Sequence, residues 1–124
     1  MRVLLIDDSR TMRGLQKLVL AQLGFTQVLE VGDGVEALES VERFKPDLII
    51  CDWNSPRSNG LNFVKTFRLQ DALTPIIMCT SEASRSCISE ALRAGVNSYV
   101  VKPFTPDLLS QRIYETTARM STQV

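Results

Sequence analysis

The sequence contains no histidine, and this absence removes several kinds of site at once. Without an imidazole, a Ser-His-Asp triad, a His-Cys zinc site and an intrinsic phosphohistidine are all excluded. The three cysteines, Cys51, Cys79 and Cys87, are odd in number and lack the spacing of metal ligands. Cys51 and Cys79 fall inside apolar runs, where a free cysteine behaves as a small hydrophobic side chain. A structural role for the cysteines is therefore favoured over a redox role.

The chain also lacks an excess charge and a long apolar segment. Its 14 basic residues are balanced by 14 acidic residues, so no net field attracts nucleic acid or an anionic membrane. No apolar run approaches the ~20 residues that span a bilayer. The first eight residues turn acidic too early for a secretory signal. We therefore expect a cytoplasmic protein that binds neither nucleic acid nor a membrane.

The 124 residues fit one domain of common size. Short apolar runs alternate with segments of helical periodicity, which indicates βα units and a parallel sheet. Several runs are apolar at successive positions, as expected for strands covered by helices on both faces. Strands are predicted at Val3–Ile6, Gln27–Val31, Leu48–Cys51, Ile76–Thr80 and Ser98–Val101. The prediction is one α/β domain of the (βα)5 type over residues 1–124, with no linker.

The segments between the predicted strands have the periodicity and the end signals of helices. Asp33 and Thr105 are predicted N-caps, and Gly24 and Gly95 are predicted to end helices. Apolar stripes predict the faces that meet the sheet: Met12, Leu15, Val19 and Leu23; Val35, Leu38 and Val41; Ile88, Ala91 and Leu92; Leu109, Ile113 and Thr116.

Polar side chains stand at the ends of three predicted strands: Asp7 and Asp8, Asp52, and Thr80. The carboxyl ends of parallel strands share one edge of the sheet, where ligands bind in open α/β folds. Carboxylates gathered there repel one another unless a cation lies among them, and Mg²⁺ prefers oxygen ligands. The sequence therefore predicts a Mg²⁺ site with Asp8 and Asp52 as direct ligands and Asp7 acting through water. The backbone carbonyl of Asn54 is a further candidate ligand.

Lys102 brings a positive charge to the same edge, at the end of the fifth predicted strand. It can pair with Asp52 or with an oxyanion bound to Asp52, and a cis bond before Pro103 would help to aim it. Thr80 can donate its hydroxyl to a phosphoryl oxygen. A carboxylate nucleophile, Mg²⁺, a lysine and a hydroxyl together describe phosphoryl transfer to an aspartate.

Each of these residues also has a purely structural interpretation. Asp7 and Asp8 can be favourable acids at the start of a helix, and Lys102 can be a solvated lysine at a strand end. Thr80 can simply occupy a strand. The combination with Asp52 favours the functional interpretation.

The segments that carry these residues resemble response-regulator receiver domains over essentially the full length. They are Leu-Leu-Ile-Asp-Asp-Ser-Arg (4–10), Cys-Asp-Trp-Asn-Ser-Pro (51–56), Thr-Ser-Glu (80–82) and Ala-Gly-Val-Asn-Ser-Tyr-Val-Val-Lys-Pro-Phe (94–104). The resemblance implies a flavodoxin-like three-layer sandwich with strand order 2-1-3-4-5. It also implies a stand-alone receiver without an output domain, of the kind that acts in chemotaxis, and not an enzyme acting on a separate substrate.

The resemblance further implies a role for each site residue. Asp52 would be the phosphoacceptor, Thr80 the switch hydroxyl and Lys102 the phosphate-binding lysine, with a cis Lys102–Pro103 bond. Other positions would set the rate of dephosphorylation (Asn54, Ser81 and Glu82) or form the switch and partner face (Tyr99, Ile88 and Arg93). The implied partners are a histidine kinase that donates the phosphoryl group, a target such as a flagellar motor switch component, and a phosphatase.

Two residues depart from the family pattern, and several alternatives stay open. Ser55 and Asn59 stand where the family commonly has an apolar residue and an aspartate, so the surface of the loop after Asp52 is altered. The alternatives are a phosphate-sink or relay receiver, a pseudo-receiver that binds without phosphorylation, and a hydrolase with an aspartyl intermediate. A hydrolase of this type requires a second acidic residue at the position of Asn54. Nucleotide or flavin binding lacks a glycine-rich phosphate loop, since Gly32-Asp33-Gly34 is an ordinary helix start.

Overall fold

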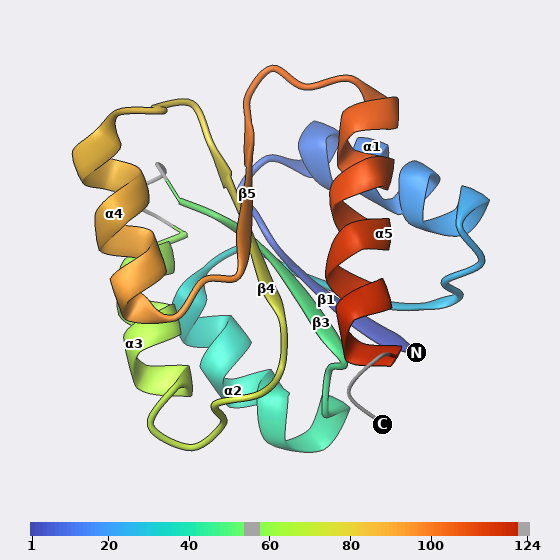
Figure 1. Ribbon diagram of the computed structural model, residues 1–124. Coiled ribbons are helices and arrows are strands. Elements are labelled where there is room, and N and C mark those ends of the chain that lie inside the picture. Colours follow the sequence, from blue (N-terminus) through green and yellow to red (C-terminus); the bar gives the residue numbers. More distant parts are fainter. Residues whose placement is uncertain (54–57, 122–124) are drawn as a thin grey trace.

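The computed structural model describes residues 1–53 and 58–121, and in them strands and helices alternate along the chain (Figure 1). The strands are β1 Arg2–Ile6, β2 Gln27–Val31, β3 Leu48–Asp52, β4 Ile76–Thr80 and β5 Ser98–Val101. The helices are α1 Arg10–Gln22, α2 Gly34–Phe44, α3 Gly60–Phe67, α4 Arg85–Ala94 and α5 Pro106–Ser121. The predicted (βα)5 pattern is confirmed, with strand ends within one residue of those predicted. None of the described helices has both the length and the apolar character needed to cross a membrane.

The five strands form one parallel sheet in the order β2-β1-β3-β4-β5, as the resemblance implied. The chain passes from β1 to β2 on one side and then returns to β3 on the other side of β1. The winding therefore reverses between β1 and β3, and in open α/β sheets ligands bind where the winding reverses. The register places Ile6 beside Cys51, so the residues that follow them, Asp7 and Asp52, end neighbouring strands.

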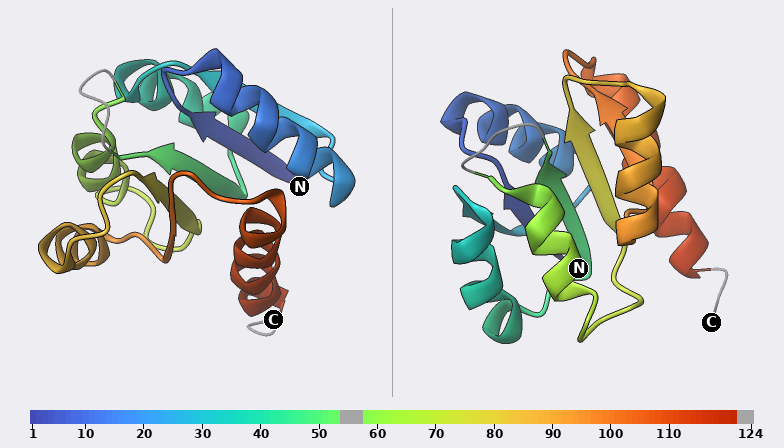
Figure 2. Two further views of the ribbon diagram at one scale, coloured as in Figure 1. Left: turned by 90° about the horizontal axis from the view of Figure 1, so that it is seen from above. Right: turned by 90° about the vertical axis from the view of Figure 1, so that its left-hand side faces the viewer.

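Helices cover both faces of this sheet, which makes the three-layer sandwich (Figures 1 and 2). Successive side chains of a strand point to opposite faces. Leu4 and Ile6 of β1 thus join a core under α2, α3 and α4, whereas Val3 and Leu5 join a core under α1 and α5. All five residues of β3 and of β4 are buried, which explains why these strands read as uninterrupted apolar runs.

The predicted helix ends are confirmed by their contacts. The Asp33 carboxylate accepts a hydrogen bond from the backbone N–H of Glu36, and the Thr105 hydroxyl accepts one from the N–H of Leu108. Gly95 ends α4 with a φ of 117°, and Gly24 follows α1 with a φ of 91°. Both are left-handed conformations that glycine adopts without steric cost.

Three large residues of the predicted stripes do not face the core. Val35 is 63% exposed, Leu92 51% and Leu23 38%. The first turn of α2 instead buries Gly34 and Ala37, and α4 buries Ala91. Small residues face the sheet where the helix backbone approaches it closely, so the neighbouring large side chain is turned about 100° away from the core. The prediction was wrong at Val35 and Leu92 because the neighbouring Gly34 and Ala91 are the buried residues. It was wrong at Leu23 because α1 ends at Gln22 and Leu23 is its C-cap.

Candidate functional site

Three carboxylates meet at the carboxyl ends of β1 and β3. One carboxylate oxygen from each of Asp7, Asp8 and Asp52 lies within 4.8 Å of the other two. Asp7 is fully buried and Asp52 is 3% exposed, whereas Asp8 is exposed. The backbone holds Asp7 there, because its N–H donates to the carbonyl of Val31 and so continues the ladder between β1 and β2. The predicted meeting of the three acids is confirmed, and the exposed Asp8 leaves the cluster open to solvent on one side.

Lys102 reaches this cluster from the far side of β4. The N–H of Lys102 donates to the carbonyl of Thr80 (2.7 Å), which extends the pairing of β4 with β5. The Lys102–Pro103 peptide bond is cis, as predicted. The ammonium Nζ lies 2.8 Å from Asp52 Oδ1 and 3.3 Å from Asp7 Oδ2, so one cation is shared by two buried carboxylates.

The protonation of these groups follows from their surroundings. Burial raises the pKa of Asp7 above its usual value, against the opposing effects of the Ser9 N–H and of Lys102. Burial alone would lower the pKa of Lys102, but its hydrogen bond to Asp52 and the charges of both carboxylates outweigh burial and raise it. Lys102 is therefore charged at neutral pH. Three carboxylates against one ammonium group leave an excess of negative charge, which suits a divalent cation with oxygen ligands.

Thr80 ends β4 at the same edge of the sheet and is fully buried. Its hydroxyl donates to the backbone carbonyl of Glu82 (2.9 Å) and accepts from the N–H of Glu82 (3.0 Å). The side chain of Glu82 accepts a hydrogen bond from Ser84, the N-cap of α4, and Ser81 is exposed. The contacts of Thr80 thus connect the site to the start of α4.

The predictions for Asn54 and Ser55 lie outside the described residues. Asn59 is described, and its backbone adopts a left-handed conformation (φ 47°) immediately before α3. The sequence had marked it only as a departure from the family pattern. Asparagine is one of the few residues that tolerate this conformation, which accounts for its presence at this turn.

Two side chains that contact the acids were not anticipated. The buried hydroxyl of Ser58 donates to Asp52 Oδ2 (3.1 Å), and the guanidinium of Arg13 donates to the backbone carbonyl of Asp7 and to the Glu30 carboxylate. Arg13 belongs to α1, and its helical spacing carries no sign of this contact. Ser58 lies outside the helices and strands, where periodicity predicts nothing.

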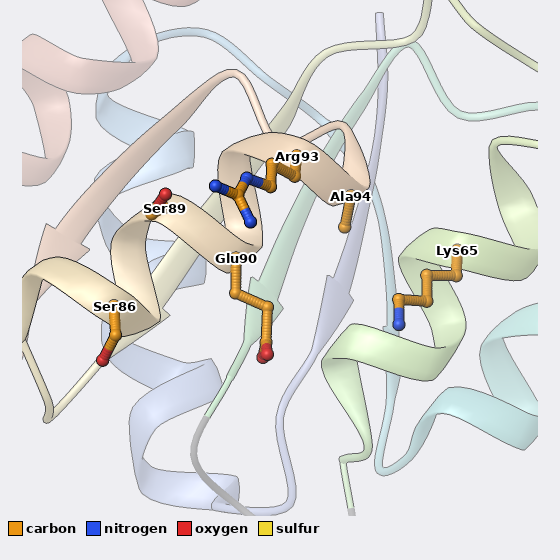
Figure 3. Close-up of a pocket in the computed structure, with 6 residues that line it drawn as sticks. All are labelled: Lys65, Ser86, Ser89, Glu90, Arg93 and Ala94. Atoms are coloured by element: carbon orange, nitrogen blue, oxygen red, sulfur yellow. The ribbon is translucent and has the colours of Figure 1, made fainter.

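The residues predicted to form the partner face lie apart from the acids. Tyr99 is half-buried and packs against the core under α4, while Ile88 lines a shallow hollow with Leu92 on α4. Arg93 lines a different hollow of about 620 Å³ between α3 and α4 (Figure 3). The other residues of that hollow are Lys65, Ser86, Ser89, Glu90 and Ala94. The structure brings none of these residues to the acids, and their role in binding stays a prediction.

Comparison with known proteins agrees with this geometry. The sequence model of the response regulator receiver domain family matches residues 3–114. The chain is 44% identical over 116 residues to the chemotaxis protein CheY1 of Helicobacter pylori (91% of this chain and 94% of the relative). It is 42% identical over 115 residues to the chemotaxis protein CheY of Pseudomonas aeruginosa (91% and 93%).

A solved structure gives the same result in three dimensions. The chemotaxis protein CheY4 of Vibrio cholerae superposes with a TM-score of 0.86 at 35% identity, covering 93% of this chain and 97% of that one. The match of the family model covers most of the chain and includes all three acids, Thr80 and Lys102. The chain therefore belongs to the response-regulator receiver family.

Proposed function

We propose that Asp52 accepts a phosphoryl group from the phosphohistidine of a histidine kinase, and that the phosphorylated protein binds a target in the control of the flagellar motor. One observation carries this proposal: Asp52 is buried at a strand end, hydrogen-bonded to Lys102 and beside Asp7 and Asp8. As a receiver domain, the protein is a phosphoacceptor switch and not a conventional enzyme.

The proposed transfer uses the two kinds of charge present at the site. An oxygen of Asp52 attacks the phosphorus, the P–N bond of the donor breaks, and the imidazole leaves with its electron pair. The Lys102 ammonium, 2.8 Å from Asp52, offsets the charge of the incoming phosphoryl oxygens. It also offsets the repulsion between the buried carboxylates of Asp7 and Asp52, both of which it contacts.

The oxygen donors of the site fit Mg²⁺. We assign Asp8 and Asp52 as direct ligands and Asp7 as a ligand through water; the Asn54 carbonyl, also assigned, lies outside the described residues. The exposure of Asp8 supports this arrangement, because Mg²⁺ usually keeps several of its waters. When bound, the ion supplies positive charge next to the transferring group, which is where catalysis of phosphoryl transfer mostly lies.

The proposed switch begins at Thr80. Its hydroxyl would turn from the backbone of Glu82 toward the phosphoryl group, and Tyr99 would move inward to fill the space. Because Glu82 and Ser84 lie at the start of α4, the change would reach the face that includes Ile88, Arg93 and Tyr99. Ser81, Glu82 and Asn54 would set how fast the phosphoryl group is lost, with or without a phosphatase. Such a switch requires a partner that binds the two states with different affinity.

The chemistry can be tested with acetyl phosphate and Mg²⁺. We expect the protein to gain the mass of one phosphoryl group, and we expect Asp52→Ala to gain none. Asp107→Ala is a matched control, since it removes an exposed carboxylate from the first turn of α5 that is not one of the three clustered acids. Sustained turnover of a phosphate ester without a stable phosphorylated protein would contradict the proposal and favour a hydrolase.

The partner can be tested with beryllofluoride, a stable mimic of the phosphoryl group. The similarity to chemotaxis proteins of 42–44% identity supports a flagellar motor component as the target. We expect such a component to be captured with beryllofluoride and Mg²⁺ and released without them. Capture that ignores beryllofluoride and persists in Asp52→Ala would favour a pseudo-receiver. Phosphorylation without any such capture would favour a phosphate sink or a relay receiver.

A further inference from the structure

The two oxygens of the Asp52 carboxylate have different partners. Oδ1 accepts a hydrogen bond from the charged ammonium of Lys102 (2.8 Å), and Oδ2 accepts one from the neutral hydroxyl of Ser58 (3.1 Å). Ser58 is fully buried, and a carboxylate can only accept, so the hydroxyl is the donor. The side chain of Ser58 is therefore directed at the atoms that would react.

The backbone of Ser58 lies close to the first residue of α2, and the nearby Gly60 lies close to the end of β3. A Cβ added at Gly34, the first residue of α2, would lie 2.8 Å from the backbone oxygen of Ser58. A Cβ added at Gly60 would lie 2.6 Å from the backbone oxygen of Asp52. Both distances are too short for real atoms, so Gly34 allows α2 to approach Ser58, and Gly60 allows the start of α3 to approach the end of β3. The position of the hydroxyl follows from this packing.

We propose that the Ser58 hydroxyl is a catalytic group that shortens the lifetime of the phosphorylated state; this inference rests on the proposed phosphorylation of Asp52. The free carboxylate carries a full negative charge over its two oxygens. In the acyl phosphate one of these oxygens bridges to phosphorus, and the carboxyl group carries much less charge. A donor aimed at the carboxylate therefore stabilises the free form more than the phosphorylated form.

The same donor acts on the rate of hydrolysis. Water attacks the phosphorus, the bond between phosphorus and the Asp52 oxygen breaks, and its electron pair returns to the carboxylate. The products are the Asp52 carboxylate and inorganic phosphate, which keeps the protons of the water. Negative charge develops on Asp52 as the bond breaks, and a donor already in place stabilises developing charge without reorganisation. The hydroxyl of Ser58 is such a donor.

Lys102 alone cannot stabilise the free carboxylate more than the phosphorylated form. Its positive charge attracts the free carboxylates of Asp52 and Asp7, and it equally attracts the oxygens of a bound phosphoryl group. It therefore stabilises both states. The hydroxyl of Ser58 is neutral and contacts Asp52 Oδ2. Its hydrogen bond therefore changes the difference in free energy between the free and the phosphorylated state.

The experiment compares Ser58→Ala with Ser58→Thr, which keeps the hydroxyl. Each protein is phosphorylated with acetyl phosphate and Mg²⁺, the donor is removed, and the loss of the phosphoryl mass is followed over time. We expect Ser58→Ala to lose its phosphoryl group about tenfold more slowly than the unmodified chain, from the strength of a hydrogen bond to a charged group. We expect Ser58→Thr to restore most of the rate. Ser58→Cys, nearly equal in volume to serine but a weak donor, should decay slowly like alanine.

The result has clear alternatives. If Ser58→Ala takes up the phosphoryl group and loses it as fast as the unmodified chain, or faster, the inference is overturned and the proposed function stands. If the unmodified chain takes up no phosphoryl group, both are overturned. A purely structural role of Ser58 would lower the melting temperature of Ser58→Ala and Ser58→Cys without slowing the decay in either. That pattern would also overturn the inference.

Discussion

The ammonium group of Lys102 donates a 2.8 Å hydrogen bond to Asp52, although the two residues are 50 positions apart in the chain. The contact exists because β5 pairs with β4 and β4 with β3, so that both residues stand at the same edge of the sheet. Lys102 is mostly buried and also contacts Asp7 at 3.3 Å. It is thus the cation that lets two buried carboxylates remain side by side.

Replacing Lys102 by methionine should therefore destabilise the protein in a way that depends on Mg²⁺. With EDTA present, we expect the free energy of unfolding to fall by about 3 kcal/mol, because two buried carboxylates lose their shared cation. Saturating Mg²⁺ should stabilise the variant more than the unmodified chain, since the ion binds more tightly when no lysine competes for the same carboxylates. Urea unfolding with EDTA and with Mg²⁺ measures both effects.

Lys17→Met is the control for this comparison. Lys17 contacts Glu30 at 3.1 Å, but its side chain is 50% exposed, so its loss should cost less than about 1 kcal/mol. Its effect should be the same with and without Mg²⁺. Equal stability of Lys102→Met and the unmodified chain in EDTA would contradict the role assigned to Lys102.

Gly60 should not tolerate a side chain. A Cβ at this position would lie 2.6 Å from the backbone oxygen of Asp52 and 3.0 Å from the sulfur of Cys51, both of which belong to the rigid strand β3. We expect Gly60→Ala to lower the free energy of unfolding by about 2 kcal/mol through overpacking. We also expect slower phosphorylation by acetyl phosphate, since relief of the clash displaces Asp52.

Gly14→Ala is the matched control, because a Cβ at Gly14 meets nothing within 4 Å. Gly14 lies inside α1, where alanine is favoured over glycine, so this variant should gain about 0.5–1 kcal/mol. Urea unfolding of the two variants should therefore give changes of opposite sign. Stabilisation of both would show that α3 can move away from β3.

Much of this site could be predicted because it depends on topology. In a parallel sheet the carboxyl ends of all strands share one edge. The order of the strands therefore brings Asp7, Asp52 and Lys102 together, and this does not depend on the conformation of the loops. The apolar runs of β3 and β4 mark those strands clearly, since both faces are covered. Three separate positions in the sequence thus predicted one cluster.

The unpredicted features depend on the path of loops and on close packing. Ser58 donates a hydrogen bond to Asp52, six positions earlier in the chain, and the next residue, Asn59, has a left-handed backbone. Neither property has a periodic signal. Val35 was placed on an apolar stripe by its spacing, but the buried residue at the start of α2 is Gly34, where a Cβ would lie 2.8 Å from the backbone oxygen of Ser58. Steric fit between distant segments is not visible in a pattern of apolar residues.

The three cysteines should differ sharply in reactivity toward a thiol reagent such as DTNB. Burial raises the pKa of Cys79 to about 12, and it raises the pKa of Cys51 well above the usual value. The thiolate is the reactive form, so both should react only when the protein unfolds. Cys87 is half-buried in the first turn of α4 and should react in the folded protein. We expect one fast thiol in the native state and three in urea.

Cys87→Ser identifies the fast thiol, because this variant should have none in the native state. Fast reaction of Cys51 or Cys79 in the folded protein would contradict the packing of β3 and β4. It would also weaken the structural role that the sequence predicted for both residues.

Asp71 lies at the opposite end of the sheet, and it should make the free energy of unfolding depend on pH. Burial would raise the pKa of its carboxyl group, but hydrogen bonds from the side chain and N–H of Thr74, and from the N–H of Leu73, outweigh burial and lower the pKa below 3.8. The unfolded chain then binds a proton more readily than the folded one. The stabilisation by Asp71 is therefore complete well above pH 3.8 and is lost as the pH falls through the pKa of the folded state.

Asp71→Ala should accordingly lower the free energy of unfolding at pH 7 by about 1 kcal/mol, a modest value because the carboxylate is partly exposed. The difference from the unmodified chain should narrow as the pH falls from 3.8 through the lower pKa of the folded state, below which Asp71 is protonated in both states. Glu42→Ala, which removes an exposed carboxylate near the end of α2, should change stability little at either pH. Urea unfolding at pH 7 and at low pH provides the measurement. A difference that stays constant with pH would mean that the loop after α3 is held by the shape of the Asp71 side chain and not by its charge.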